Sequence, residues 1–370
     1  MRQKAPNKFL ALFPKTIALF ILGGCAGVLV DDNIKSINLT PIDFKNLPGW
    51  SEGQQGGALE PFLLSCRKIL VEDKLNFHRG GNFGSINSWR TACKKLDSGR
   101  FNNHRYARKY FEENFRAFLV GWGSRKNSQG LFTGYYEPQF KGATKNYGKY
   151  QTPIYPAPNN LNKIAGKYYS RKQINRGVLE SYVEPIAWLS DPVDVFFLQI
   201  QGSGRIKLPN NSVIRLGYAG HNRHSYTSIG RILVQRGEIP RELLSMQTIR
   251  SWLQRNPTKV SELLERNARY VFFRRMTSAG PLGAQGVPLT PGRSLAIDPK
   301  FLTYGLPTWV DTKDPLDAYK TLRRLFITQD TGGAIKGAVR GDVFFGHGRM
   351  AAKRAGYMNR QGRYYVLVPI

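Results

Sequence analysis

Acidic residues are scarce in this chain of 370 residues: 25 aspartates and glutamates stand against 55 lysines and arginines, for a formal net charge of +30. Such an excess of positive charge favours association with an anionic polymer. Nucleic acid is one candidate. However, the basic residues are spread along the chain, with only short clusters such as Arg274-Arg275, and no recognisable nucleic-acid-binding motif accompanies them. We therefore favour an anionic wall or membrane surface and predict no specific nucleic-acid partner.

Cysteine and histidine are also few, with three and five copies. Three cysteines cannot build the framework of a disulfide-rich domain. His221 and His224 stand on a loop rich in glycine and asparagine, and no cysteine or histidine pair has the spacing of metal ligands. The sequence therefore predicts no metal and no cofactor. Cys66 and Cys93 could form one disulfide or remain two buried thiols, and the spacing of two cysteines does not decide between these states.

Long apolar runs are missing as well. Beyond the N-terminal segment no stretch of 18 consecutive apolar residues occurs, so no membrane-spanning helix is expected there. Basic residues between positions 2 and 15 precede an apolar run at 16–24 that is too short to span a membrane. This order is typical of a secretory signal peptide.

The signal ends in two glycines and Cys25, and small residues before a cysteine resemble a bacterial lipobox. Cleavage there leaves Cys25 as an acylated N-terminus. We predict that residues 1–25 are a lipoprotein signal peptide and that the mature chain is lipid-anchored on the periplasmic side of the outer membrane. The alternative is an ordinary signal peptide and a soluble, secreted or periplasmic protein.

Hydrophobic residues make up 41% of the full sequence, and their spacing divides the part after the signal peptide into segments. Residues 26–58, with their Asp, Asn, Ser, Pro and Gly, predict a tether. Helical spacing over 60–70 and 101–120 predicts helices, and short apolar runs from position 132 onward predict strands. The expected strands are 193–200, 213–218, 294–297, 308–310, 324–328, 343–345 and 364–368, with helices at 228–236 and 242–264.

Near the C-terminus Asp330 and Asp342 flank a glycine-rich segment that carries Lys336. A strand ending at Asp330, a flexible turn and a strand beginning near Asp342 would bring both carboxylates to one cleft wall. Glycines there allow a ligand to approach the backbone closely. Alternatively, both aspartates cap backbone amides at turns and strand ends.

Several motifs resemble the membrane-bound lytic murein transglycosylase A family. Its C-terminal three-aspartate domain is matched at 295–299 (LAIDP), 329–337 (QDTGGAIKG) and 341–342 (GD). Its middle segment is matched at 131–138 (LFTGYYEP), 197–204 (FLQIQGSG) and 217–220 (GYAG). The resemblance covers residues 131–367, about two thirds of the chain.

The resemblance implies a mainly β fold with N-terminal helices: a double-psi β-barrel domain with an inserted second β-domain and a groove between them. The barrel, or catalytic domain, would comprise residues 59–138 and 276–370. The inserted β-domain, residues 139–275, would line the glycan groove.

The implied activity is cleavage of the β-1,4 bond between N-acetylmuramic acid and N-acetylglucosamine in peptidoglycan, with formation of 1,6-anhydromuramoyl products. Asp342 would be the single acid/base, with Asp330 in support. Burial beside residues 343–345 and the charge of Asp330 would raise the pKa of Asp342. The residues expected to contact the glycan are Thr133, Tyr136, Gln201, Ser203 and Lys336.

Two other classes remain. A non-catalytic wall-glycan-binding protein would carry the same motifs. The triplet Asp330-Thr331-Gly332 also occurs in aspartic proteases, which need two such loops, whereas this chain has one. The sequence does not predict an oligomeric state.

Overall fold

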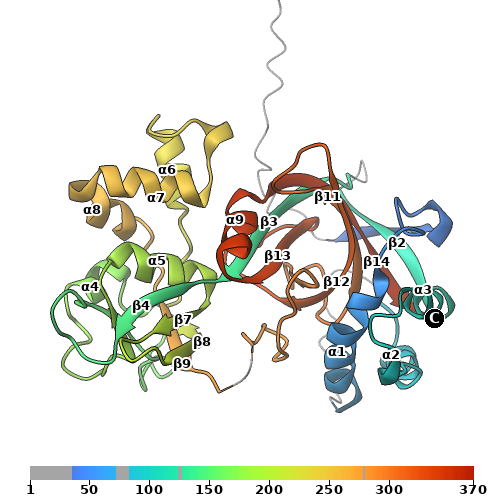
Figure 1. Ribbon diagram of the computed structural model, residues 1–370, viewed down its shortest axis with the longest axis horizontal. Helices are drawn as coiled ribbons and strands as arrows, with labels where there is room; N and C mark the ends of the chain where they lie inside the picture. The colour runs from blue at the N-terminus through green and yellow to red at the C-terminus, as the bar shows by residue number, and fades with distance from the viewer. Residues whose placement is uncertain (1–35, 72–82, 124–126, 278–279) are drawn as a thin grey trace, which may run out of the picture.

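The computed structural model describes residues 36–71, 83–123, 127–277 and 280–370, which form two lobes joined side by side (Figure 1). The chain leaves the first lobe through β3 (Gly130–Glu137), which continues past Pro138 as β4 (Gln139–Ala143) of the second. It returns to the first lobe after β9 (Val271–Arg275). The predicted signal peptide and Cys25 lie outside the described residues.

The first lobe contains an eight-stranded sheet in the order β1-β2-β14-β11-β12-β10-β13-β3. Because β14 also pairs with β3, the strands from β14 to β3 close into a ring, and β2 and β1 extend from it. The other strands are β1 (Ile37–Ile42), β2 (Phe115–Trp122), β10 (Ser294–Ala296), β11 (Pro307–Lys313), β12 (Thr321–Asp330), β13 (Arg340–His347) and β14 (Asn359–Pro369).

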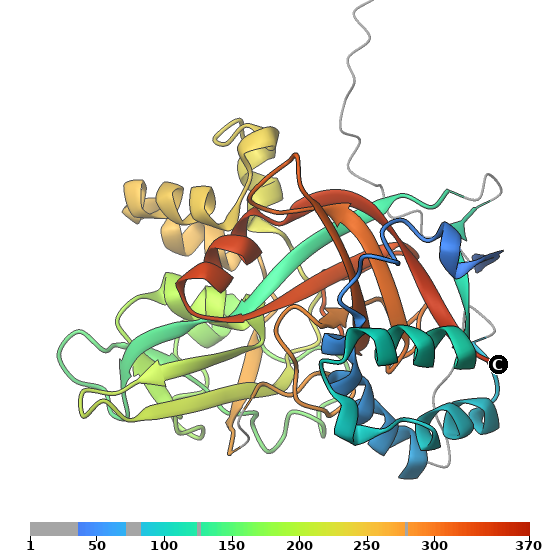
Figure 2. The same cartoon turned by 45° about the vertical axis from the view of Figure 1, so that its right-hand side comes forward.

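Three helices pack together beside this sheet (Figure 2). They are α1 (Leu59–Val71), α2 (Ile86–Lys94) and α3 (His104–Asn114). Of the two states left open for the cysteines, the structure contains the disulfide: Cys66 of α1 is bonded to Cys93 of α2, with 5.3 Å between their Cα atoms. The bond joins the two helices that cover one side of the lobe.

The helix expected over 101–120 is wrong at its C-terminal end. α3 ends at Asn114, and Phe115 adopts an extended backbone and begins β2. β2 pairs with both β1 and β14. Backbone pairing on two sides therefore overrides the helical spacing of the aromatic residues.

The tether predicted over 26–58 is also too long. Within the described residues, β1 pairs along its whole length with β2, and Leu47 and Trp50 are buried. The Trp50 ring packs edge-on against Trp309 of β11, with centroids 5.1 Å apart. The polar composition of this segment concealed the few apolar residues that attach it to the core.

The second lobe contains a six-stranded sheet in the order β5-β6-β4-β7-β8-β9. Its remaining strands are β5 (Thr152–Ile154), β6 (Ala187–Leu189), β7 (Ser203–Lys207) and β8 (Val213–His221). Its helices are α4 (Arg171–Asn175), α5 (Pro192–Gln201), α6 (Ile229–Gln235), α7 (Met246–Arg255) and α8 (Val260–Glu265). The single helix expected over 242–264 is thus two helices, interrupted at Asn256 and Pro257.

The strand expected at 193–200 is wrong, because this segment is the helix α5. The Asp191 side chain caps it, Pro192 occupies its first turn, and Gly202 ends it with a φ of 75°. One side of α5 packs on the core of the six-stranded sheet and the other on the core formed with α6, α7 and α8. A helix buried on both sides shows no apolar stripe, so its sequence resembles a buried strand.

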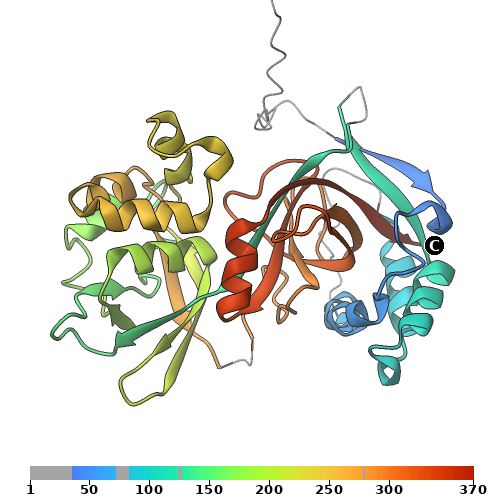
Figure 3. The ribbon, with the colours of Figure 1, turned by 45° about the horizontal axis from the view of Figure 1, so that its top comes forward.

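The remaining helix, α9 (Arg349–Tyr357), packs on β3 and β13 and faces the helices of the second lobe (Figure 3). Short 3-10 turns complete the described structure at Phe44–Asn46, Gln55–Ala58, Ser98–Arg100, Arg241–Leu243 and Pro257–Lys259. No helix in the described ranges has the length and apolar character needed to cross a membrane.

Candidate active site

Asp330 and Asp342 lie on either side of one short strand. Ala296 of β10 is the register partner of Asp330 in β12 and of Asp342 in β13. Two neighbouring strand spacings separate the aspartate backbones by roughly 10 Å. The sheet therefore holds both carboxyl groups at the same level of the first lobe, where both side chains are partly exposed.

Asp342 is held on one side by the neighbouring strand. β13 runs parallel to β3, with Asp342 opposite Thr133, and Thr133 Oγ1 donates to Asp342 Oδ1 at 2.6 Å. The buried Arg340 in turn donates from a terminal guanidinium nitrogen to Thr133 Oγ1 at 2.8 Å. Asp342 Oδ2 has no hydrogen-bond partner in the described part of the chain. One carboxylate oxygen is thus fixed and the other is available to a ligand.

Asp330 differs because both of its oxygens are engaged. Tyr135 donates its hydroxyl to Oδ2 at 2.7 Å. Oδ1 accepts from the backbone amides of Ala284 at 3.0 Å and Thr331 at 2.9 Å. Asp330 therefore ties β12 to β3 and to the loop that contains Ala284.

Burial raises the pKa of both aspartates. The pKa of Asp330 rises to about 6, because desolvation outweighs its hydrogen bonds, and the negative charge of Asp342 adds a smaller increase. Desolvation also raises the pKa of Asp342, against the opposing effects of the Arg340 charge and the Thr133 hydrogen bond. The like charges of the two aspartates also disfavour ionisation of the pair, whereas the positive charge of Arg340 favours ionisation of Asp342.

The apolar surroundings come from a small buried cluster of Tyr135, Leu289, Ala296 and Phe344. The Tyr135 and Phe344 rings lie 5.2 Å apart. Of the three apolar residues after Asp342, only Phe344 belongs to this cluster, because Val343 faces the main core. Phe345 is partly buried and lies beneath the Arg354 guanidinium.

The third aspartate, Asp298, is buried and supports the glycine turn. Its carboxylate accepts from the backbone amides of Gly337 at 2.9 Å and Lys300 at 3.1 Å. The turn presents Lys336, which is exposed and forms no ion pair with any described residue. Through its hydrogen bond to Gly337, Asp298 thus stabilises the conformation of the segment between Asp330 and Asp342.

The other predicted glycan contacts lie where the lobes meet. The backbone amide of Tyr136 donates to Oε1 of Gln201, the last residue of α5, at 2.9 Å. Ser203 is mostly buried in β7 opposite Gly217. The structure therefore brings Thr133 to Asp342 and Tyr136 to Gln201, while Ser203 belongs to the sheet of the second lobe.

Sequence reasoning missed Tyr135 and Arg340 as site residues. Strand alternation places Tyr135 on the same face of β3 as Thr133, so each hydroxyl reaches one aspartate. Arg340 similarly stands two residues before Asp342 on β13. The period of two was the signal that could have identified both.

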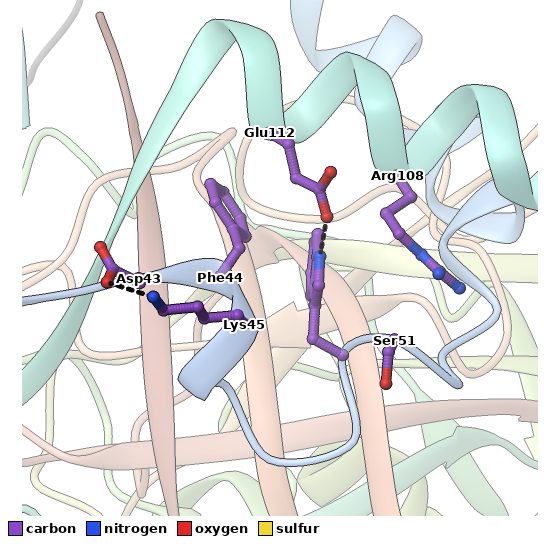
Figure 4. Close-up of a pocket in the computed structure, with 7 residues that line it drawn as sticks. Asp43, Phe44, Lys45, Ser51, Arg108 and Glu112 are labelled. Atoms are coloured by element: carbon purple, nitrogen blue, oxygen red, sulfur yellow. Dashed lines mark hydrogen bonds and ion pairs between the residues drawn. The ribbon is translucent and has the colours of Figure 1, made fainter.

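A separate pocket of about 720 Å³ lies between the 3-10 turn at Phe44–Asn46 and α3 (Figure 4). It is lined by Asp43, Phe44, Lys45, Trp50, Ser51, Arg108 and Glu112, and none of the three aspartates contributes. Trp50 donates from its indole nitrogen to Glu112 at 2.8 Å. Across the described ranges, no group of three His, Cys, Asp or Glu residues is placed to hold a metal ion.

Comparison with known proteins first defines the class. The MltA specific insert domain matches residues 131–274, and the 3D domain matches residues 293–368. The chain is 33% identical over 336 residues to membrane-bound lytic murein transglycosylase A of Escherichia coli strain K12, covering 85% of this chain and 89% of that protein. It is 32% identical over 252 residues to the Vibrio cholerae enzyme of that name, covering 66% and 67%.

Solved structures agree with these sequence relationships. The crystal structure of a membrane-bound lytic murein transglycosylase from Agrobacterium tumefaciens superposes with a TM-score of 0.80 at 31% identity, covering 90% of this chain and 98% of that one. E. coli MltA with bound chitohexaose gives a TM-score of 0.67 at 29% identity, with 90% and 92% covered. This chain belongs to the membrane-bound lytic murein transglycosylase A family.

Proposed function

We propose that this chain is a lytic transglycosylase that cleaves the β-1,4 bond between N-acetylmuramic acid and N-acetylglucosamine of peptidoglycan, with formation of 1,6-anhydromuramoyl products. Family membership supports the reaction class. The observation that carries the assignment to a residue is the one-sided environment of Asp342, whose Oδ1 is held by Thr133 while Oδ2 is left without a partner among described residues.

In the proposed reaction, protonated Asp342 gives its proton to the bridging oxygen as the bond from that oxygen to the muramoyl anomeric carbon breaks. The C6 hydroxyl of the same muramoyl unit attacks the anomeric carbon, and its proton passes to the Asp342 carboxylate. One carboxyl group therefore serves as acid and then as base. Glycosidases that activate a water or form a covalent intermediate use two carboxyl groups. A well-oriented intramolecular attack can contribute roughly 7–11 kcal/mol.

The surroundings of Asp342 suit both protonation states. Burial raises its pKa and favours the protonated acid at the start of the reaction. The Arg340 charge and the Thr133 hydroxyl stabilise the carboxylate that remains after proton transfer. Asp330 is the weaker candidate for the acid, because its two oxygens already accept three hydrogen bonds. We assign it a supporting role through its charge and its hold on Tyr135.

We further propose that the first lobe is a double-psi β-barrel and that the glycan lies in a groove between the lobes. Lys336, Tyr136, Gln201 and Ser203 would contact its sugars, and Thr133 would act mainly through Asp342. The chitohexaose complex of an E. coli relative supports a glycan ligand. The split of the domains would follow the two sheets, with residues 139–275 as the insert.

Relatives carry the name membrane-bound, which supports our proposal of a lipid anchor at Cys25 and a location on the periplasmic side of the outer membrane. Fractionation of cells that express the wild type or Cys25→Ser tests this proposal. A wild type that is fully soluble after secretion, with a free N-terminus beyond Cys25, would exclude the anchor.

Mass spectrometry of sacculi digested by the purified protein tests the reaction. We expect muropeptides that end in 1,6-anhydromuramic acid. Products with reducing ends would indicate hydrolysis by a water molecule. Binding to sacculi without any product would indicate a wall-glycan-binding protein.

A further inference from the structure

Arg269 of the second lobe reaches the turn that separates the two aspartates. It lies between α8 and β9. A Cβ placed on Gly333 would stand only 3.1 Å from Cζ of Arg269. The guanidinium therefore rests against the backbone of Gly333, three residues beyond Asp330, and any side chain at position 333 would displace it.

The backbone that carries Arg269 is firmly fixed. Its carbonyl accepts from the buried Arg171 guanidinium at 2.6 Å, and its amide donates to Asn267 Oδ1 at 3.3 Å. The preceding carbonyl, of Ala268, accepts from Asn222 Nδ2 at 2.8 Å. The guanidinium is thus presented from a rigid support, which lowers the entropy lost when it binds a ligand.

This guanidinium has no acidic partner within the described part of the chain. Its single hydrogen bond is a long one, from a terminal nitrogen to the His224 carbonyl at 3.4 Å. A second arginine, Arg223, acts with Arg269 on the nearby His221. Burial and the charges of these two arginines lower the pKa of His221 to about 4, so that His221 is neutral at physiological pH. A partly buried arginine without a carboxylate partner would be stabilised by binding an anionic ligand.

The substrate class proposed above supplies such an anion. Every N-acetylmuramic acid carries a lactyl group, which ends either in a free carboxylate or in a peptide that bears carboxylates. A guanidinium fork binds a carboxylate through two parallel hydrogen bonds, and it is therefore better suited to this ligand than a lysine. Uncharged sugar rings would leave Arg269 unpaired.

We propose that Arg269 binds a substrate carboxylate and so makes the enzyme favour glycan strands that carry acidic substituents. This inference rests on the proposed function and adds to it a site for the non-sugar part of the substrate. The position against Gly333 places the bound carboxylate beside the segment that connects Asp330 to Asp342.

Three preparations of the same soluble glycan strands test the proposal. The first carries intact peptides, and the second has been treated with an amidase that removes the peptides and leaves the lactyl carboxylates. In the third, every carboxyl group has been converted to its N-methylamide. Binding and the rate of anhydromuramoyl release are measured for the wild type, Arg269→Gln and Arg269→Lys. Arg266→Gln is the matched control, because Arg266 is exposed and pairs with Glu262 at 3.1 Å.

For Arg269→Gln we expect affinity for carboxylate-bearing strands to fall roughly tenfold, since hydrogen bonds to charged groups are the strong ones. Affinity for the amidated strands should match that of the wild type. Arg269→Lys should recover part of the loss, and Arg266→Gln should bind normally. A loss with intact strands alone identifies a peptide carboxylate, and a loss that persists after amidase treatment identifies the lactyl group.

Equal losses on all three preparations would overturn the proposal, because they would show that Arg269 only supports the turn. No loss on any preparation would overturn it too. Failure of the proposed function is separate: in that case the wild type releases no anhydromuramoyl product, while the binding comparison still tests Arg269.

Discussion

The hydroxyl of Thr133 lies 2.6 Å from Oδ1 of Asp342 and joins the carboxylate to the buried guanidinium of Arg340, which is 2.8 Å from the same hydroxyl. Three residues on two parallel strands thus form one chain of hydrogen bonds. The chain holds Oδ1 of Asp342 in place and partly offsets the effect of burial on the pKa of Asp342.

Replacing the proposed acid, as Asp342→Asn, should nearly abolish release of anhydromuramoyl products. Loss of general acid catalysis costs about 10²- to 10⁴-fold, and the upper end applies because the same group also serves as base. Affinity for glycan strands should change little, since the proton is transferred only in the transition state. Near wild-type release from Asp342→Asn, with an inactive Asp330→Asn, would reverse the two roles.

Thr133→Val should move the pH dependence rather than abolish activity. Loss of its hydroxyl removes a hydrogen bond that stabilises the ionised form of Asp342, so the pKa of Asp342 should rise. The alkaline limb of the kcat profile should therefore shift upward, by about one pH unit. Thr133→Ser keeps the hydroxyl and should restore the wild-type profile. A profile that is unchanged in Thr133→Val would show that this contact does not act on the titrating group.

Asp330→Asn should be milder and should shift the optimum in the opposite direction. Removal of a negative charge roughly 10 Å away favours ionisation of Asp342 and lowers the alkaline limb of the kcat profile by up to about one pH unit.

The pH dependence of the free energy of unfolding gives a second test of Asp330. The pKa of Asp330 is raised from 3.8 in the unfolded chain to about 6 in the folded protein. The contribution of Asp330 to the free energy of unfolding is therefore fully present below pH 3.8 and is lost as the pH rises through about 6. Denaturant unfolding between these pH values should show a larger loss of stability in the wild type than in the variant, in which Asp342 still contributes.

The convergence of the two aspartates could be expected from the sequence, because two strands joined by a glycine-rich turn lie in one sheet. Their separation by β10 could not, since that strand comes from a distant segment with only three residues in the sheet. The helix α5 was mistaken for a strand because both of its sides are buried. Strand alternation places Arg340 on the same face of β13 as Asp342, but its contact with Thr133 could not be predicted before the register of β13 and β3 was known.

The disulfide should contribute measurably to stability. Cys66 and Cys93 are 27 residues apart, and a bond across a loop of this size restricts the unfolded chain. The double variant Cys66→Ala, Cys93→Ala should lose about 2–4 kcal/mol of unfolding free energy. Reductant should weaken the wild type by a similar amount and leave the double variant unchanged. If reductant affects both proteins equally, the bond is not formed in solution.

The large positive charge, which is +30 over the full sequence including the predicted signal peptide, should govern binding to the wall at long range. Counter-ions screen exposed charges over about 10 Å at 0.1 M salt and about 3 Å at 1 M. Binding to sacculi should therefore fall at least about tenfold across this range. The rate at saturating substrate should change less, because the proposed acid lies partly buried beside Thr133 and Arg340. Co-sedimentation with sacculi measures the first quantity and product release the second, with duplex DNA as a competing polyanion. Salt-independent co-sedimentation would show that groove contacts and not net charge dominate binding, whereas tighter binding to DNA than to sacculi would favour a nucleic-acid partner.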